Sequence, residues 1–126
     1  MRGMPQMLRL DRDGGLLGHL TVWQNLLLPL EYHGRDTAQA MEEAALLYAL
    51  CGEDEKKLPQ FLGSYPDALG SYEKRLAGFM RAMLLEPDSL ALDDVCDGLG
   101  DREREKAMRW EQVFRLRFPF RAVLKE

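Results

Sequence analysis

The residues best suited to chemistry gather in one stretch of the chain, YPDALGSYEKRLAGFMRAMLLEPDSLALDDVCDGLG, residues 65–100. This stretch has the outline of a nucleotide-handling segment, with glycine and serine before a helix and two carboxylates, Asp93 and Asp94, after an apolar strand. A triphosphate also needs a Gly-rich loop ending in Gly-Lys-Ser/Thr, because successive backbone N–H groups and the lysine must surround the phosphates. No Gly-Lys pair occurs in the 126 residues. The sequence therefore predicts a nucleotide-handling scaffold without the primary phosphate site.

Other reactive side chains give weaker signals. His19 lies in a predicted loop and His33 at a predicted helix end, so both are expected to be surface or half-buried residues without a catalytic role. Cys51 and Cys96 are two cysteines without an export signal, which predicts reduced structural thiols and a cytoplasmic protein.

The composition describes one soluble globular domain, with 46% hydrophobic and 30% charged residues. The net charge is −4, and the basic residues alternate with acidic ones, as in DREREK at 101–106. No basic stripe is formed, which argues against nucleic-acid binding and against attraction to a membrane surface. The most apolar stretch, LTVWQNLLLPL, is too short to span a bilayer, which needs about 20 residues. Any membrane link is therefore expected through a partner.

Helical spacing and capping residues predict four main helices. Thr21 caps the first, which Pro29 should kink or end, and Asp36 caps the second, which ends at Gly52. Ser71 caps the third, to about residue 85, and Asp101 caps a long fourth helix to about residue 117. The expected inward residues of the last two helices are Leu76, Phe79, Met80, Met83, Leu84, Met108, Trp110, Val113 and Phe114.

Three short segments predict strands, namely PQMLRLD at 5–11, SLALD at 89–93 and RAVL at 121–124. The last two strands flank the long helix, and strand, helix and strand in this order are typical of a right-handed parallel crossover. The fold class expected from this pattern is α/β and rich in helices.

The order of these pieces resembles the ATP-binding cassette (ABC) transporter ATPase family, closest to its lipid-trafficking and toluene-tolerance subunits. The segment GGLLGHLTVWQNLLLPLEYHG resembles the part after the family's glutamine loop, and residues 65–94 follow its signature, Arg-Ala pair, Glu-Pro-Asp turn and Walker B strand. The resemblance implies a single domain, 1–126, with a partial P-loop NTPase fold. Residues 12–86 would correspond to the helical subdomain, and residues 1–11 and 87–126 to a remnant of the α/β core with a three-stranded parallel sheet.

The signature segment departs from the family pattern. The family reads Leu-Ser-Gly-Gly-Gln, whose amides at a helix start contact a γ-phosphate, whereas this chain has Leu69, Gly70, Ser71, Tyr72 and Glu73. By the resemblance, the Tyr72 ring stands where backbone must approach phosphate, and the Glu73 carboxylate faces a negative ligand. Ser71 is then more simply a helix cap than a phosphate contact.

The remaining nucleotide positions are also altered. By the resemblance, Asp93 would hold the water shell of Mg²⁺, and Asp94 would replace the glutamate that polarises the attacking water. Without phosphates nearby, both are more simply strand-end carboxylates. Arg12 stands in place of the glutamine of the glutamine loop, Gly100 in place of the D-loop aspartate, and neither histidine fits the switch position.

Two functions remain open from the sequence. The favoured one is a cofactor-free interaction or regulatory module that binds a transporter permease or an ABC ATPase subunit. The alternative is a divergent or truncated ATP-binding subunit that uses ATP and Mg²⁺ beside a complete subunit. The resemblance places a permease-binding groove at Leu16, Leu17, Leu20, Val22 and Trp23, although Val22 and Trp23 also fit an ordinary core. It also leaves the RAVL strand as an open sheet edge, which predicts a homo-oligomer.

Overall fold

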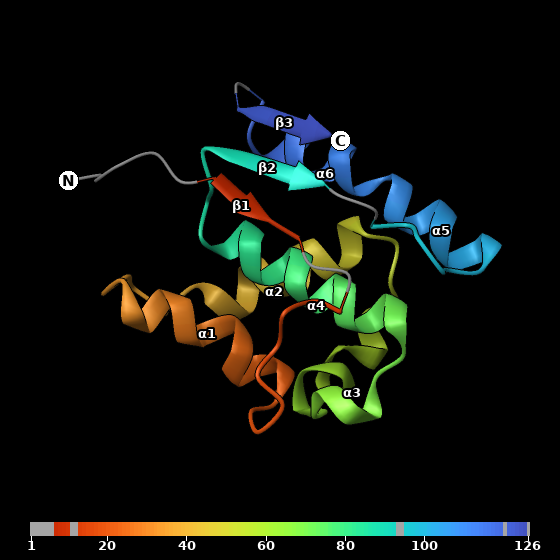
Figure 1. Ribbon diagram of the computed structural model, residues 1–126. Helices are drawn as coiled ribbons and strands as arrows, with labels where there is room; N and C mark the ends of the chain where they lie inside the picture. The colour runs from red at the N-terminus through yellow and green to blue at the C-terminus, as the bar shows by residue number, and fades with distance from the viewer. Residues whose placement is uncertain (1–6, 11–12, 93–94, 120, 126) are drawn as a thin grey trace.

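The computed structural model describes residues 7–10, 13–92, 95–119 and 121–125, and Figure 1 shows its ribbon. Three strands, β1 (Met7–Arg9), β2 (Ser89–Leu92) and β3 (Ala122–Lys125), form one sheet in the order β1-β2-β3. Both pairings are parallel, and Leu90 of β2 lies opposite Leu8 of β1 and Val123 of β3. β1 and β2 lie within predicted strand segments, and β3 overlaps the predicted segment 121–124 and extends one residue beyond it.

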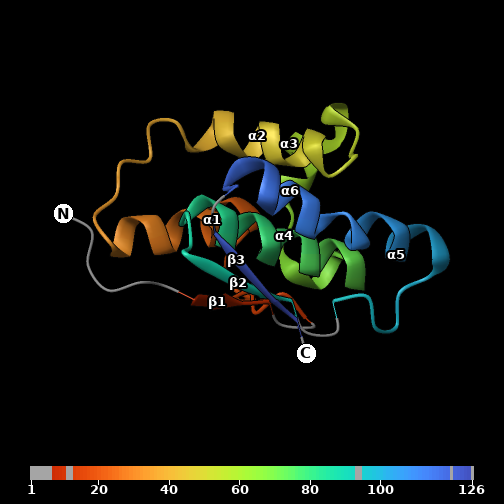
Figure 2. The ribbon, with the colours of Figure 1, turned by 90° about the horizontal axis from the view of Figure 1, so that it is seen from above.

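Helices supply most of the remaining chain. They are α1 (Val22–Tyr32), α2 (Ala40–Leu50), α3 (Leu58–Gly63), α4 (Ser71–Leu84), α5 (Asp101–Met108) and α6 (Trp110–Arg117). Two 3₁₀ turns, Glu55–Lys57 and Pro66–Ala68, flank α3. Figure 2 shows α2, α4 and α6 on one side of the sheet. No helix in the described ranges is long and apolar enough to cross a membrane.

The core is built around α4. Its inward side chains, Leu76, Phe79, Met80, Met83 and Leu84, are buried as the sequence predicts. Phe79 stacks on Trp110 of α6, with ring centroids 5.0 Å apart and planes 7° apart, and Phe114 of the same helix is also fully buried. Because buried aromatic pairs contribute beyond the area that they bury, this stack anchors α6 to α4.

One predicted helix is wrong. The long helix expected at 101–117 is two helices that meet at Arg109, and Met108 before that junction is 66% exposed rather than inward. Of the two outcomes expected at Pro29, a kink or an end, the end does not occur, because the first helix continues to Tyr32. Leu30 just beyond the proline is buried, so packing of the last turn favours helix despite the missing N–H.

Helix starts differ from the predicted caps at three places. Thr21 does cap α1, by accepting from Gln24 N, but Asp36 accepts from Ala38 N in a turn before α2. Gly70 and Gly100, not Ser71 and Asp101, are the N-cap residues of α4 and α5. Glycine is an acceptable N-cap. Ser71 and Asp101 are therefore the first residues of their helices, and Asp36 lies several residues before α2.

Candidate functional site

The start of α4 is the part of the nucleotide-handling segment that the structure places in full. Leu69 is buried, Gly70 and Ser71 are exposed, and Gly70 has an extended backbone that leads into the helix. The N–H of Gly70 donates to Glu73 Oε1 over 3.3 Å. The carboxylate predicted to face a ligand therefore lies at the helix start, where it accepts a hydrogen bond from the N–H of the N-cap residue.

Tyr72 corrects the sequence prediction, because its ring lies in the core rather than where a phosphate would approach. Its side chain is buried, and its hydroxyl donates to Glu53 Oε2 over 2.6 Å. Lys106 of α5 lies 3.3 Å from the same oxygen, and the Tyr72 ring lies 5.8 Å from that of Trp110. Burial, and then the hydrogen bond to Glu53, raise the pKa of Tyr72 above its usual range. This tyrosine therefore joins the first turn of α4 to the loop before α3 and to α5.

Arg12, Asp93 and Asp94 lie outside the described residues, so the glutamine-loop and Walker B predictions stay predictions. Gly100, at the D-loop position, is exposed before α5. In the described ranges no group of three His, Cys, Asp or Glu side chains is arranged to hold a metal ion. His19 and His33 are exposed, as predicted.

Two arginines of α4 bind the loops at the sheet end, a role that the sequence reasoning missed. Arg75, although buried, donates to the Val95 carbonyl over 2.9 Å. Arg81 donates to the carbonyls of Gly15 (2.9 Å) and Gly14 (3.0 Å). The available signal was the spacing, since Arg75 falls on the buried side of the helix next to Leu76. Because α4 fixes the segments after β1 and after β2, it positions both loops that follow the described sheet.

The predicted groove residues do not all share one surface. Val22 is fully buried and belongs to the core, so it lines no groove. Leu16 and Trp23 are partly buried against the core, Leu20 is half-buried, and Leu17 is 43% exposed. The structure thus leaves Leu17 and Leu20 as the members most open to a partner.

Asn25 holds the segment that carries these leucines, and it is a second residue that the sequence reasoning missed. Its side chain is 1% exposed. Its Oδ1 accepts from Leu17 N over 2.8 Å, and the two hydrogens of its Nδ2 are shared among the carbonyls of Leu17, Leu20 and Thr21, which lie 2.9–3.2 Å away. A buried amide whose oxygen and nitrogen both have partners fixes a loop firmly, because a buried polar group without a partner costs stability. The signal was an asparagine on the apolar side of a predicted helix.

Comparisons with known proteins show similarity to import ATP-binding proteins. No family model matches the chain. The chain is 34% identical over 84 residues to the methionine import ATP-binding protein MetN of Mesorhizobium japonicum, covering 67% of this chain and 22% of that protein. It is 33% identical over 95 residues to the formylaminopyrimidine import ATP-binding protein ThiZ of Halalkalibacterium halodurans, covering 75% and 36%. The chain thus spans only about a fifth to a third of these relatives.

A solved structure gives the same fold. The chain matches a dimeric, post-hydrolysis structure of the ATP-binding cassette MJ0796 bound to ADP and Pi, with a TM-score of 0.73 and 19% identity. The match covers 96% of this chain and 51% of that one. The described fold is therefore that of part of an ABC ATPase, and the chain is similar to import ATP-binding proteins.

Proposed function

We propose that this chain is an ABC-ATPase-like interaction or regulatory module that binds a transporter permease or an ABC ATPase subunit and has lost nucleotide binding and hydrolysis. The observation that carries the proposal is the Glu73 carboxylate on the Gly70 amide at the start of α4. In the family that this segment resembles, the same helix start faces a phosphate. Here the side chain of Glu73, in the first turn of the helix, accepts a hydrogen bond from the N–H of the N-cap residue Gly70.

The charge of Glu73 supports the proposed loss of phosphate binding at the start of α4. A helix N-terminus stabilises an anion by about 0.3–1 kcal/mol at the surface and by up to about 2 kcal/mol when partly buried. Two negative charges about 4 Å apart repel by roughly 4 kcal/mol at the effective dielectric constant near a protein surface. At that separation the repulsion by Glu73 would outweigh the attraction of the helix, which supports the proposed loss of ATP and Mg²⁺ binding.

The alternative function is a divergent ATP-binding subunit that couples hydrolysis to transport beside a complete subunit. The observation in its favour is the similarity to import ATP-binding proteins. In that case ATP and Mg²⁺ would be cofactors, with Asp93 and Asp94 in the Walker B position. We also propose that the partner transporter is of the lipid-trafficking type, as the sequence resemblance suggests.

Titration calorimetry with MgATP tests the loss of nucleotide binding. We expect no micromolar binding of MgATP to the 126-residue chain, because no Gly-Lys loop is present and the Glu73 carboxylate lies at the start of α4. Micromolar binding would overturn this part of the proposal.

A reconstitution experiment separates the two functions. The chain is mixed with a complete import ATP-binding subunit, and the ATPase rate is measured with the wild-type chain, with Glu73→Gln and with Asp94→Asn. The proposed function predicts that neither variant changes the rate relative to the wild-type chain. An ATPase rate that rises with the chain, rises further with Glu73→Gln and is lost with Asp94→Asn would establish the alternative.

Partner binding is tested on the leucines that Asn25 holds in place. We expect Leu17→Asp combined with Leu20→Asp to abolish co-purification with the permease, because a charge in an apolar contact must be desolvated without a counter-ion. Leu28→Asp is the matched control, since Leu28 on α1 is 42% exposed and Leu17 is 43% exposed. Equal loss with the control would show that the groove is not specific. Binding of this kind would place the protein at the cytoplasmic side of the membrane through its partner.

A further inference from the structure

A separate cavity lies away from the start of α4. Its volume is about 670 Å³, and it lies between the end of α1, the start of α2 and the ends of α4 and α6. Leu30, Ala40, Met83 and Leu84 lie beneath its lining, each less than 9% exposed, and give it a small apolar floor. This size and partly apolar lining fit a small organic ligand.

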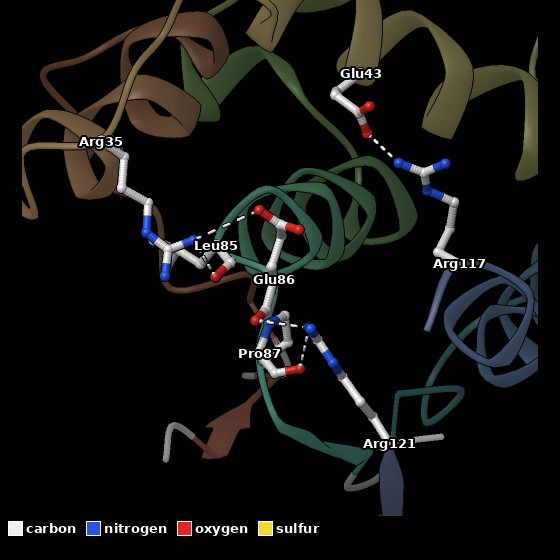
Figure 3. A network of polar contacts seen from close by, with 7 residues as sticks. All are labelled: Arg35, Glu43, Leu85, Glu86, Pro87, Arg117 and Arg121. Atoms are coloured by element: carbon white, nitrogen blue, oxygen red, sulfur yellow. Dashed lines mark hydrogen bonds and ion pairs between the residues drawn. The ribbon is translucent and has the colours of Figure 1, made fainter. Parts of the chain in front are cut away.

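Three arginines from different segments line the same cavity, and Figure 3 shows Arg35 on one side with Arg117 and Arg121 on the other. Arg35 Nη1 donates to the Leu85 carbonyl over 2.7 Å. Arg121 Nη1 donates to the carbonyls of Glu86 (2.9 Å) and Pro87 (3.1 Å). A backbone carbonyl orients a guanidinium without neutralising it, and each guanidinium keeps further N–H donors. Arg35 and Arg121 are thus held in place with their charge available.

The carboxylates of the cavity differ in how well they are satisfied. Glu43 is paired with Arg117 Nη2, and Asp36 Oδ1 accepts from Ala38 N over 2.8 Å. Glu86 makes only a loose contact, 3.9 Å from Arg35 Nη1, with its side chain 63% exposed. An exposed ion pair of this length contributes little, so the Glu86 carboxylate can leave at low cost.

Glu86 is also backbone-strained. Its φ of 51° is the one positive value found at a non-glycine residue in the described ranges, and Pro87 follows it. A side chain in the left-handed region is uncommon and is found more often at functional sites. This backbone conformation accompanies a carboxylate that, in Figure 3, points into the space between Arg35 and Arg117.

We propose that this cavity binds a small organic acid or phosphate ester. Its oxyanion takes the place of the Glu86 carboxylate between Arg35 on one wall and Arg117 and Arg121 on the other. Its apolar body lies against Leu30 and Met83. Without ligand, the Glu86 carboxylate occupies the position of that oxyanion, and the three arginines are balanced by three carboxylates. When Glu86 moves out, the cavity has an excess of positive charge, and an anion is then favoured. Guanidinium groups suit this task because they bind carboxylate and phosphate with paired N–H donors.

The test uses three probes with the same ring and different heads, namely benzoate, phenyl phosphate and benzamidine, at constant ionic strength. Amide chemical shifts of the ¹⁵N-labelled chain are followed by NMR. We expect saturable shifts at residues 83–86 and at Ala40 with the anions and none with benzamidine. The tighter of the two anions identifies the head as carboxylate or phosphate.

Substitutions of Glu86 and of the arginines should change the anion affinity in opposite directions. Glu86→Gln should tighten anion binding, because the internal competitor loses its charge. Arg35→Gln and Arg121→Gln should each weaken it by about tenfold or more, the usual effect of losing a charge-assisted hydrogen bond. Arg115→Gln is the control on α6, since Arg115 pairs with Glu111 and does not line the cavity.

Several results would overturn the proposal. They are the absence of saturable shifts in both the wild type and Glu86→Gln, binding of benzamidine as tight as that of benzoate, or equal weakening by Arg115→Gln. Failure of Glu86→Gln to tighten binding would overturn the role of Glu86 as internal stand-in. Weak MgATP binding that disappears in Arg121→Gln would belong to this cavity, whereas binding that survives would belong to the start of α4.

Discussion

Tyr72 shows how one residue can be assigned to the wrong environment. Its place in the signature-like segment suggested an obstacle to phosphate, yet its side chain lies under α5 and bonds Glu53. The helical spacing already contained the answer, because Tyr72, Leu76 and Phe79 are four and three residues apart and share one side of α4. The periodicity of the helix was therefore a better guide to this side chain than its family position. What the sequence did not indicate was the partner, since Glu53 is 19 residues away.

The cluster around Tyr72 predicts a loss of stability at alkaline pH. Burial, followed by the charge of Glu53, raises the pKa of the Cys51 thiol from 9.0 to about 12, and burial likewise raises the pKa of Tyr48 from 10.0 to about 12. A raised folded-state pKa means that the folded state holds the proton more tightly than the unfolded state. The resulting stability is complete below pH 9 and is lost as the pH rises from 9 to about 12.

Urea unfolding at several pH values checks this prediction. The free energy of unfolding should be flat up to about pH 9 and should then fall. Cys51→Ala and Tyr72→Phe should each make the fall shallower, whereas Cys96→Ala should leave it in place. A free energy of unfolding that stays constant to pH 11 would contradict the prediction.

At the scale of elements, α4 and the turn after β1 approach unusually closely at two glycines. An ideal Cβ on Gly78 would lie 2.7 Å from the Gly14 carbonyl oxygen, and Gly14 itself has a φ of 82°. Alanine in a helix gains about 1 kcal/mol over glycine, but overpacking against backbone costs about 1–3 kcal/mol. The clash also displaces the carbonyl that accepts from Arg81. We expect Gly78→Ala to destabilise the fold by about 2 kcal/mol.

The control for this variant is Gly63→Ala at the end of α3, where nothing lies within 4 Å of an added Cβ. That variant should be neutral or slightly stabilising in the same denaturation experiment. If both variants change the free energy of unfolding equally, the close approach of α4 to the turn after β1 does not contribute to stability.

The elements themselves were more predictable from sequence than their ends and their contacts. Apolar periodicity located the strands and the buried side of α4, because these depend on local patterns. The junction at Arg109 was missed, since the stretch from Asp101 to Arg117 has no glycine or proline and reads as one helix. Asn25, Arg75 and Arg81 were missed as loop-holding residues because their partners are backbone carbonyls, which carry no side-chain signal in the sequence.

At the scale of the whole molecule, the sheet presents open edges in the part of the chain that the structure describes. β2 is the middle strand, and β3 pairs only with β2. An unpaired edge offers a row of N–H and C=O groups to another chain. Met108 on α5 and Leu116 on α6 are 66% and 68% exposed and offer further apolar side chains to a second copy. Both features favour pairing of two copies, through the β3 edge or through these helices.

We therefore expect the 126-residue chain to form a homodimer at high micromolar concentration, and light scattering measures its mass against the 14.5 kDa of one copy. Val123→Pro should restore the monomer if β3 forms the contact, because proline removes a backbone donor from the edge strand. Leu116→Asp should do so if the α5 and α6 surface forms it. Circular dichroism shows whether each variant keeps its helices, so that loss of the dimer is not confused with unfolding. A wild-type chain that stays monomeric at this concentration would show that neither the β3 edge nor the helix surface recruits a second copy.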